Sequence, residues 1–511
     1  MKADFFLTLV LLAVCHHSIA VAQSPGTFTA TGSMTTPREL HAATLLLDGK
    51  VLITGGYSAS DEDYVLLPAA NAELYDPSTG VFTITSDMMS GVFAPYRVTQ
   101  PYPGVPGAKG TLLPDGRVFV GGTVLRDGRV FIAGYPTAEV CDPVTNICAA
   151  TVPYAAPKPA ILGSSTLLAD GRVLLTGAVN ICFQPLCSDP GTSWTELFDP
   201  TAGTFSLTGS MKGYNNTYTA TLLTDGRVLF VGNDYYNGET PFAEVFDPSN
   251  ETFKVIEPPS AIHEYPRYTI LLMDGKVLFV GNDTHNGVPS FAEVFDPSNE
   301  TFKVIEPPSA SHQYGAAKLL PDGTVLFTGG LTPDDKEQVA AELYIPASRT
   351  FSAAVNMIKG HSYHTSTLLS DGTVLIAGST VGAPIISSAE LYHPAVLIPA
   401  PLLFSLSGDG RGQGAIWHAA TGQLVSQGAP ATAGEILSMY TTGLGQGNVI
   451  PPQVAIGSRF AEVLFFGNAP GYPGFNQVNV RMPGGVAPSP AIPVRLIYLG
   501  RPSNAVTIGV Q

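Results

Sequence analysis

The chain has 511 residues, of which 54 are glycine, 43 are proline and only 13% are charged, and its formal net charge is −16. This acidity argues against nucleic acids and anionic membranes as partners, because both require a basic face. Abundant glycine and proline beside many β-branched residues predict short strands joined by turns, and hence an all-β protein.

The N-terminus has the features of a secretory signal peptide. A basic second residue precedes an apolar run over residues 5–14, and Ala20 and Ala22 form a small-residue cleavage site. We therefore expect residues 1–22 to be removed and the mature protein to be secreted or held at the cell surface or in the periplasm. No later stretch is long and apolar enough to predict a membrane span.

A motif of two apolar residues, an Asp-Gly pair and a second apolar run recurs seven times. One copy reads TLLLDGKVLITGG at residues 44–56. Residues 242–261 and 291–310 are identical over the whole of FAEVFDPSNETFKVIEPPSA, so one unit was copied. The chain is therefore a repeat protein. The Asp residues of the seven turns are Asp48, Asp115, Asp170, Asp225, Asp274, Asp322 and Asp371.

Each repeat is predicted to form four strands, which we call a to d. Asp-Gly closes a two-residue hairpin between strands a and b, because both central positions need positive φ. A variable loop leads to strand c, as in Ala-Glu-Leu-Tyr at 72–75, and Asp-Pro then opens the turn into a short aromatic strand d, as at 81–83. Four strands repeated about every 50 residues predict one blade of a β-propeller.

The two ends of the repeat region complement each other. The last unit ends at His393 and Pro394 without a strand d, whereas residues 26–34 match the strand d sequence at 203–211. We therefore expect the N-terminal segment to complete the seventh blade, which leaves no open edge. In the second unit another hairpin, at 123–134, directly follows the first, so the pairing of these two hairpins stays open.

The repeat pattern resembles that of a known family. H-x-A-T-L-L-x-D-G-x-V-L-x-x-G-G followed by A-E-L-Y-D-P-x-T-G-x-F, met most fully at 41–56 and 72–82, is similar to the bacterial kelch repeat, a form shared with the propeller of galactose oxidase. The resemblance implies a seven-bladed kelch-type β-propeller over residues 26–394.

A second, smaller unit is predicted after the propeller. Residues 395–402 form a proline-containing linker, and residues 403–511 hold strand-length segments separated by Gly, Pro and Asn clusters. This pattern predicts an Ig-like β-sandwich. The unit resembles an uncharacterised C-terminal module of exported bacterial proteins, which implies no activity and suggests a spacer or a surface attachment.

Four cysteines remain after removal of the signal peptide. An even number of cysteines in an exported chain favours disulfides over a zinc site, and the sequence spacing favours two local pairs. The predicted pairs are Cys141 with Cys148 and Cys182 with Cys187.

The recurrence of a residue helps to separate scaffold from function. The a–b and c–d turns share one face of an antiparallel blade and are repetitive, whereas the d–a and b–c loops share the other face and vary, so we expect a ligand there. A glutamate recurs in every strand c, and we interpret it as a hydrogen-bond acceptor of the scaffold. These residues are Glu73, Glu139, Glu196, Glu244, Glu293, Glu342 and Glu390.

The d–a loops carry the candidate ligand-binding residues. Aromatic rings offer rigid stacking surfaces, and His or Arg adds directional donors, which suits a sugar or a peptide side chain. For His41 and His364, each seven residues before its turn Asp, packing against a neighbouring blade is the favoured interpretation. The candidates are Arg38, His41, Tyr214, Tyr218, His263, Tyr265, Arg267, His312, Tyr314, His361, Tyr363 and His364.

Tyr363 and His364 also permit a comparison with galactose oxidase, where a Tyr-His pair leading into the equivalent strand binds copper. The resemblance implies further ligands, namely a second Tyr linked to a Cys and a His from the C-terminal domain. Tyr214 or Tyr218 could replace that Tyr, but the four cysteines are predicted to be paired, and His418 lacks the expected surrounding sequence.

The sequence thus predicts a non-catalytic recognition module, without metal or other cofactor, that binds a glycan or a protein through its d–a and b–c loops. No complete catalytic set is visible. A copper radical oxidase or another carbohydrate-active enzyme of the galactose oxidase type is the alternative. A structural envelope or matrix protein is a second one.

Overall fold

The computed structural model describes residues 25–511 apart from 60–65, 69–70, 88–109, 113–117, 121–122, 126–128, 133–137, 143–146, 156–160, 179–192, 213–217, 235–239, 261–267, 284–287, 333, 335, 379–386 and 446. The predicted signal peptide lies outside the described residues. Within them, no helix is both long and apolar enough to cross a membrane.

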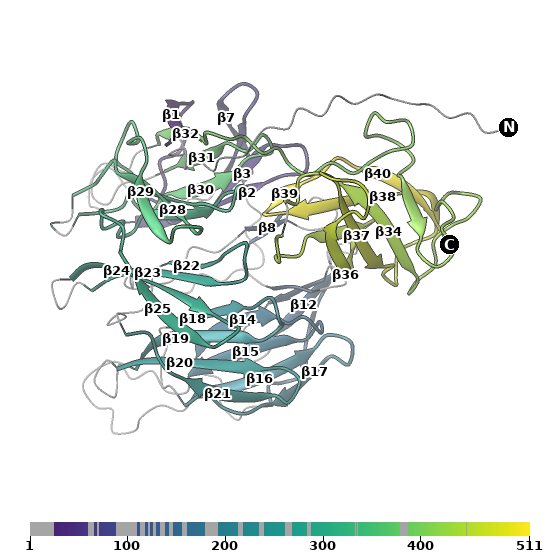
Figure 1. Ribbon diagram of the computed structural model, residues 1–511, viewed down its shortest axis with the longest axis horizontal. Coiled ribbons are helices and arrows are strands. Elements are labelled where there is room, and N and C mark those ends of the chain that lie inside the picture. Colours follow the sequence, from purple (N-terminus) through teal and green to yellow (C-terminus); the bar gives the residue numbers. More distant parts are fainter. Residues whose placement is uncertain are drawn as a thin grey trace.

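Seven four-stranded antiparallel sheets can be traced in the described residues, and they form the blades of the expected propeller (Figure 1). Blades 1 to 3 contain β2 (Ala42–Leu45), β3 (Val51–Thr54), β6 (Asn71–Asp76) and β7 (Val81–Asp87); β10 (Thr123–Val124), β11 (Val130–Ile132), β12 (Glu139–Asp142) and β13 (Ile147–Ala150); and β14 (Ile161–Leu167), β15 (Val173–Ala178), β16 (Ser193–Asp199) and β17 (Thr204–Leu207). Blades 4 and 5 contain β18 (Tyr218–Leu222), β19 (Val228–Asp234), β20 (Thr240–Asp247) and β21 (Thr252–Ile256); and β22 (Tyr268–Leu271), β23 (Val277–Asp283), β24 (Val288–Asp296) and β25 (Thr301–Ile305). Blades 6 and 7 contain β26 (Ala316–Leu319), β27 (Val325–Thr328), β28 (Ala341–Ile345) and β29 (Thr350–Ala353); and β30 (Thr365–Leu368), β31 (Val374–Ala377), β32 (Ala389–His393) and β1 (Thr27–Ala30).

The N-terminal strand closes the ring. β1 pairs with β32 in antiparallel register, with Thr27 opposite His393 and Ala30 opposite Glu390. The predicted completion of the seventh blade is therefore confirmed, and the strand c of this blade has a partner on both sides.

The pairing of the two hairpins in the second unit is resolved. β8 (Gly110–Leu112) and β9 (Val118–Val120) form a separate two-stranded sheet, whereas β10 and β11 pair with β12 and β13. The second hairpin therefore supplies the inner strands of blade 2, and the first lies against β2 of blade 1. Another two-stranded sheet, β4 (Tyr57–Ala59) and β5 (Leu66–Pro68), forms within the b–c loop of blade 1.

The strand pairing in blade 2 places the two cysteines of one predicted disulfide opposite each other. Cys141 on β12 and Cys148 on β13 are Cα partners across the strand pair, which is the arrangement that a local disulfide requires. The bond itself stays a prediction. Cys182 and Cys187 lie outside the described residues.

The hydrophobic core of the propeller lies between blades, because strands b and c alternate side chains toward both neighbours. Leu229 and Val245 of blade 4, for example, share a cluster with Val277 and Phe295 of blade 5. Corresponding clusters join the blade pairs 2–3, 3–4, 5–6, 6–7 and 7–1. Each blade is therefore stable only beside its neighbours.

The C-terminal unit is all-β and two-layered, as predicted, but both layers belong to one continuous eight-stranded sheet that folds over on itself in a barrel-like manner, not to the two separate sheets of an Ig-like sandwich. The long strand β36 pairs with β37 on one side and with β35 on the other, so it belongs to both layers. Apolar side chains from both layers form one core, which includes Leu437, Val480 and Val494. The strands are β33 (Ile416–His418), β34 (Ile436–Thr441), β35 (Gln453–Ile456), β36 (Arg459–Asn468), β37 (Asn476–Arg481), β38 (Ser489–Tyr498), β39 (Arg501–Pro502) and β40 (Val506–Val510).

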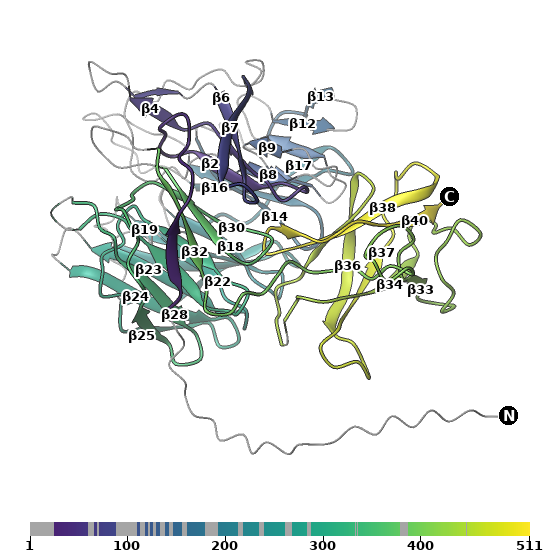
Figure 2. The same cartoon turned by 90° about the horizontal axis from the view of Figure 1, so that it is seen from above.

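The C-terminal unit packs against the face of the propeller that carries the Asp-Gly turns. Val449 N–H donates to Met273 O at 3.1 Å, beside the a–b turn of blade 5, and Ala400 N–H donates to Ser370 O at 2.7 Å in the turn of blade 7. Figures 1 and 2 show the unit, in yellow, beside this face. The d–a and b–c loops are therefore left on the opposite face.

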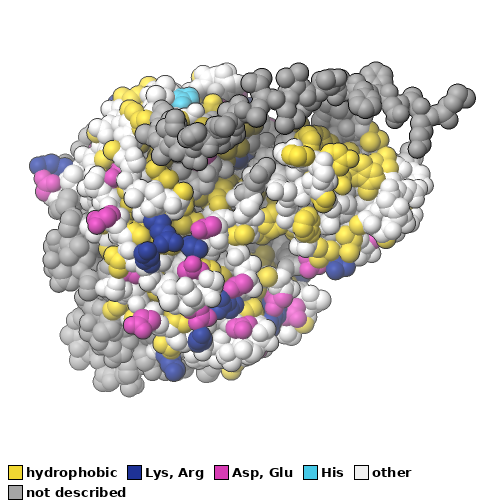
Figure 3. Space-filling model, viewed as in Figure 1, with side chains coloured by type: hydrophobic (Ala, Val, Ile, Leu, Met, Phe, Trp, Pro, Cys, Tyr) yellow, Lys and Arg dark blue, Asp and Glu magenta, His cyan; other side chains and the backbone are white. Residues whose placement is uncertain are grey.

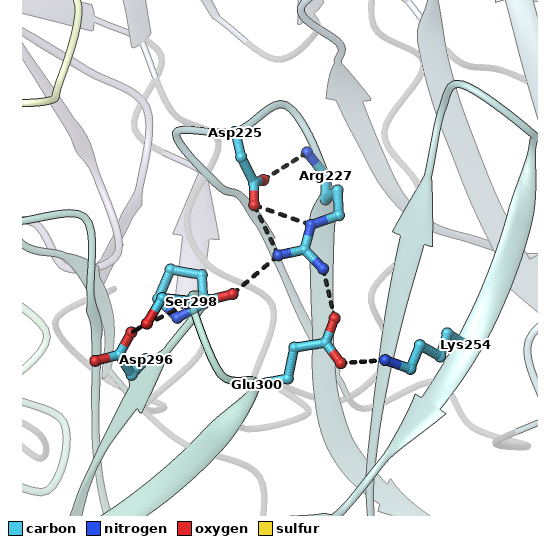
Figure 4. Close-up of polar contacts among 7 residues, drawn as sticks. Asp225, Arg227, Lys254, Asp296, Ser298 and Glu300 are labelled. Atoms are coloured by element: carbon cyan, nitrogen blue, oxygen red, sulfur yellow. Dashed lines mark hydrogen bonds and ion pairs between the residues drawn. The ribbon is translucent and has the colours of Figure 1, made fainter.

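On the turn face, arginine side chains form hydrogen bonds and ion pairs between neighbouring blades. Arg227, two residues after the turn Asp of blade 4, donates through Nη2 to Pro297 O at 3.0 Å in the c–d turn of blade 5. Its Nη1 pairs with Glu300 Oε1 at 2.5 Å, and Glu300 also binds Lys254 (Figure 4). Equivalent bonds to the Pro carbonyl of the next blade come from Arg129, at 2.7 Å, and Arg172, at 2.9 Å.

We expect Arg227→Ala to destabilise the propeller, because its partly buried side chain bonds both a carboxylate and a backbone carbonyl of the next blade. The expected loss in the free energy of unfolding is about 1 kcal/mol, measured by urea denaturation. The control is Lys336→Ala, which removes an exposed ion pair with Asp334 within one loop. Equal stability of the two variants would contradict the role of the inter-blade bonds.

Candidate functional site

The recurring glutamates anchor the loops that carry most of the candidate residues. In blades 1, 6 and 7 the carboxylate accepts two successive backbone N–H groups from the d–a loop, at distances of 2.7 to 3.0 Å. Glu244 accepts one such bond, from Lys212 N–H at 2.8 Å. The interpretation of these residues as scaffold acceptors is confirmed for the described side chains. The donor pairs are residues 35 and 36, 309 and 310, and 358 and 359.

Three candidate residues share one repeat position, ten residues before the turn Asp, and each pairs with the glutamate of its own blade. All three side chains are fully buried. A second nitrogen of each bonds the carbonyl of the glycine seven residues after the turn Asp, at 2.6 to 3.0 Å. The ion-pair distances are 3.0 Å for Arg38–Glu73, 3.0 Å for His312–Glu342 and 3.2 Å for His361–Glu390.

These contacts assign Arg38, His312 and His361 to the scaffold in this structure. Both ring nitrogens of each histidine are engaged inside the blade, so neither imidazole has a nitrogen left to bind a ligand. The signal in the sequence was the common ten-residue spacing to the turn Asp. Recurrence at one repeat position, together with complete burial of the side chain, is more simply explained by the fold than by a single binding site.

His41 and His364 contact the preceding blade, as their packing interpretation requires. His41 Nε2 lies 3.0 Å from Thr365 Oγ1, and His364 Nε2 lies 2.9 Å from Thr328 Oγ1. Burial, and then the charge of Arg38, lowers the pKa of His41 to about 3. Burial also holds the pKa of His364 well below its usual value. Both imidazoles are therefore neutral at physiological pH.

Tyr314 and Tyr363 are the candidate residues that the structure brings together on the loop face. They occupy one repeat position, eight residues before the turn Asp, and their rings stack with centroids 4.5 Å apart at 21°. Both have positive φ, 59° and 52°, and Tyr363 N–H donates to Tyr314 O at 2.6 Å. Leu40 of blade 1 continues this ladder with φ 53° and a bond to Tyr363 O. This backbone geometry places the two half-buried rings side by side, where they stack.

The remaining candidates cannot be placed. Tyr214, His263, Tyr265 and Arg267 lie outside the described residues, and Tyr218 is described only as backbone in β18. Tyr268, which follows this group, donates its hydroxyl to His312 O at 2.6 Å and so joins blades 5 and 6.

The described residues do not assemble the copper site that the resemblance implies. His364 is buried and its Nε2 is bonded to Thr328. His418 belongs to the C-terminal sandwich, where its nitrogens lie 3.0 Å from Glu435 Oε2 and 3.1 Å from Ala429 O. In the part of the chain that the structure describes, no three His, Cys, Asp or Glu side chains are grouped to hold a metal ion. No reaction step through copper is therefore derived.

Comparison with known proteins supports the fold. The chain is similar over 96% of its length to the whole of a fungal alcohol oxidase of the AA5 family, solved in complex with copper, with a TM-score of 0.52 and 15% sequence identity. No protein-family model and no curated protein sequence matches the chain. At this identity the similarity shows the galactose oxidase-like propeller fold that the kelch pattern predicted.

We expect the Glu342 anchor to make stability depend on pH. Burial raises the pKa of Glu342, but hydrogen bonds from His312 and from the Ala310 and Ser309 N–H groups outweigh it and lower the pKa to about 2. The ionised carboxylate therefore stabilises the fold above the ordinary pKa of 4.5. This contribution, about 3 kcal/mol, is lost as the pH falls from there toward 2.

The measurement is urea denaturation across this pH range. Glu342→Gln should be less stable than the wild type at neutral pH and should lose less stability on acidification. Glu306→Gln, which changes an exposed glutamate after strand d of blade 5, is the matched control and should behave as the wild type. The anchor would be contradicted by identical pH profiles for the two variants.

Proposed function

We propose that the chain is an exported, non-catalytic propeller that recognises a glycan or a protein through its loop face, with a glycan as the favoured ligand. The observation that carries the proposal is the stacked pair of Tyr314 and Tyr363. It lies in the d–a loops that lead into β26 and β30, the innermost strands of blades 6 and 7. The C-terminal unit occupies the opposite face and leaves these loops accessible.

The tyrosine pair suits recognition because it is preorganised. The positive φ angles and the backbone bond between the two residues fix the main chain, and each ring stacks on the other before a ligand arrives, so less conformational entropy is lost on binding. Aromatic faces stack on the apolar face of a sugar ring, and phenol groups add polar edges. The histidines and the arginine beside them serve the scaffold and bring no catalytic set to the described part of this face.

Alcohol oxidation, the activity named for the fungal protein of similar fold, is less well supported for this chain. The histidine of the Tyr-His pair is buried and bonded to a threonine of the preceding blade. The other histidine considered as a ligand is bonded within the C-terminal sandwich. The Nδ1 atom of His364 has no hydrogen-bond partner among the described residues, but no three metal-ligating side chains are grouped around it there.

The test is a glycan array probed with the full mature protein and with Tyr314→Ala and Tyr363→Ala. We expect each variant to lose about tenfold in affinity for the recognised glycan, because an aromatic anchor is removed. Tyr363→Phe keeps the stack and should retain most of the affinity. Val255→Ala, an exposed change on the outer strand of blade 4, is the neutral control.

Two outcomes would contradict the proposal. One is wild-type affinity in both alanine variants, which would remove the tyrosine pair from the site. The other is an array without any binding, combined with a protein array that is also blank, which would favour a structural matrix protein.

A further inference from the structure

The C-terminal sandwich carries a cleft that sequence analysis did not single out. The cleft has a volume of about 730 Å³ and lies on the outer face of β33, β34 and β37, away from the core of the sandwich. This volume is within the range of small-molecule binding sites. Figure 3 shows that hydrophobic side chains gather in a broad patch on the C-terminal unit, while most of the visible charged side chains lie over the propeller.

Strand alternation produces the floor of the cleft. Leu437 and Met439 of β34 point into the core. Each is followed along the strand by a residue that points to the opposite face, so Ser438 and Tyr440 line the cleft. β37 follows the same rule: Val478 and Val480 are buried in the core, and the amide side chains of residues 477 and 479 line the cleft. The register sets Ser438 opposite residue 479 and Tyr440 opposite residue 477.

The floor is an ordered row of polar groups. Ser438 Oγ donates to Asn479 Oδ1 at 2.8 Å, and Gln477 Nε2 donates to the same oxygen at 2.9 Å. Within the described residues, these contacts leave the Nδ2 donor of Asn479 and the Oε1 acceptor of Gln477 for a ligand. A donor and an acceptor on neighbouring amides match a pair of adjacent hydroxyl groups.

The walls of the cleft are aromatic. Trp417 packs edge to face on Tyr440, with centroids 5.5 Å apart, and Tyr440 packs in the same way on Tyr472 at 6.5 Å. Tyr472 is 61% exposed and Phe475 is 39% exposed, so both rings present apolar surface at the cleft. These rings offer flat stacking surfaces above the polar row.

The lining also restricts the charge of the ligand. No Asp, Glu, Lys or Arg is among the described residues that line the cleft, and His418 is held by Glu435 and by Ala429 O. A phosphate, a carboxylate or a cationic peptide would find no counter-charge there. A neutral ligand with apolar faces and hydroxyl edges fits both the walls and the floor.

From these observations we infer that the cleft binds a neutral oligosaccharide, with sugar rings on Trp417 and Tyr440 and hydroxyl groups on Gln477 and Asn479. The site lies on a unit separate from the loop face of the propeller and does not depend on the function proposed for that face. Two sugar sites on one chain would strengthen attachment to a polymer through avidity.

Tryptophan fluorescence tests the inference directly, because the chain has only two tryptophans, Trp194 and Trp417. In a Trp194→Phe background, emission reports the cleft alone. We expect cellohexaose, xylohexaose or mannohexaose to change this emission in a saturable way. Calorimetry on Tyr314→Ala, which keeps both tryptophans and weakens the loop-face site, measures the cleft without the background change, in case the buried Trp194 is needed for folding.

Variants separate this site from the propeller. Tyr472→Ala and Asn479→Ala should each weaken binding about tenfold, while Leu464→Ala, an exposed change outside the cleft, and Tyr314→Ala should leave it unchanged. The inference would be overturned if no neutral saccharide alters the emission, or if only an apolar dye or a second copy of the chain does. Unchanged saccharide affinity in Tyr472→Ala and Asn479→Ala would also overturn it.

Discussion

The buried carboxylate in strand c of the blades is the constraint on which the loop face depends. Without it, two successive backbone N–H groups of the d–a loop in blades 1, 6 and 7 would lose their hydrogen-bond acceptor. Buried N–H groups without an acceptor are rare in proteins, because they lower the stability of the fold. In the same blades the carboxylate fixes an Arg or a His, which in turn holds the b–c loop through a glycine carbonyl. In these three blades one acidic residue thus orients both loops of the face.

This arrangement separates the polar residues from the aromatic ones. Among the described candidates, Arg38, His312 and His361 are bonded within the scaffold. The tyrosines two residues after the two histidines, Tyr314 and Tyr363, lie on the loop face. The same division appears in the sandwich, where apolar side chains fill the core and the opposite positions form an aromatic and amide cleft. Both surfaces suit uncharged ligands, which agrees with a protein that has few charged residues.

Local rules explain how much of this the sequence could predict. The Asp-Gly and Asp-Pro turns impose their geometry on nearby residues, so the strands, the blades and the closing strand β1 follow from the repeat. Blade 2 could not be predicted, because two adjacent hairpins obey the same local rule and only packing selects one. The role of His312 depends on Glu342, about thirty residues away, and on burial. Apolar and polar residues alternate in the sequence at 436–441 and 476–481, which indicates strands with one buried face. Whether the other face is covered depends on the packing of the whole C-terminal unit.

The central claim is that the buried histidines near Tyr363 serve the fold and hold no metal. Electron paramagnetic resonance of the mature protein, loaded with Cu(II) and then passed through gel filtration, tests it most directly. We expect no stoichiometric copper to be retained, and no difference between the wild type and His364→Asn. Stoichiometric copper that is retained by the wild type and lost in His364→Asn would contradict the account and make this residue a ligand.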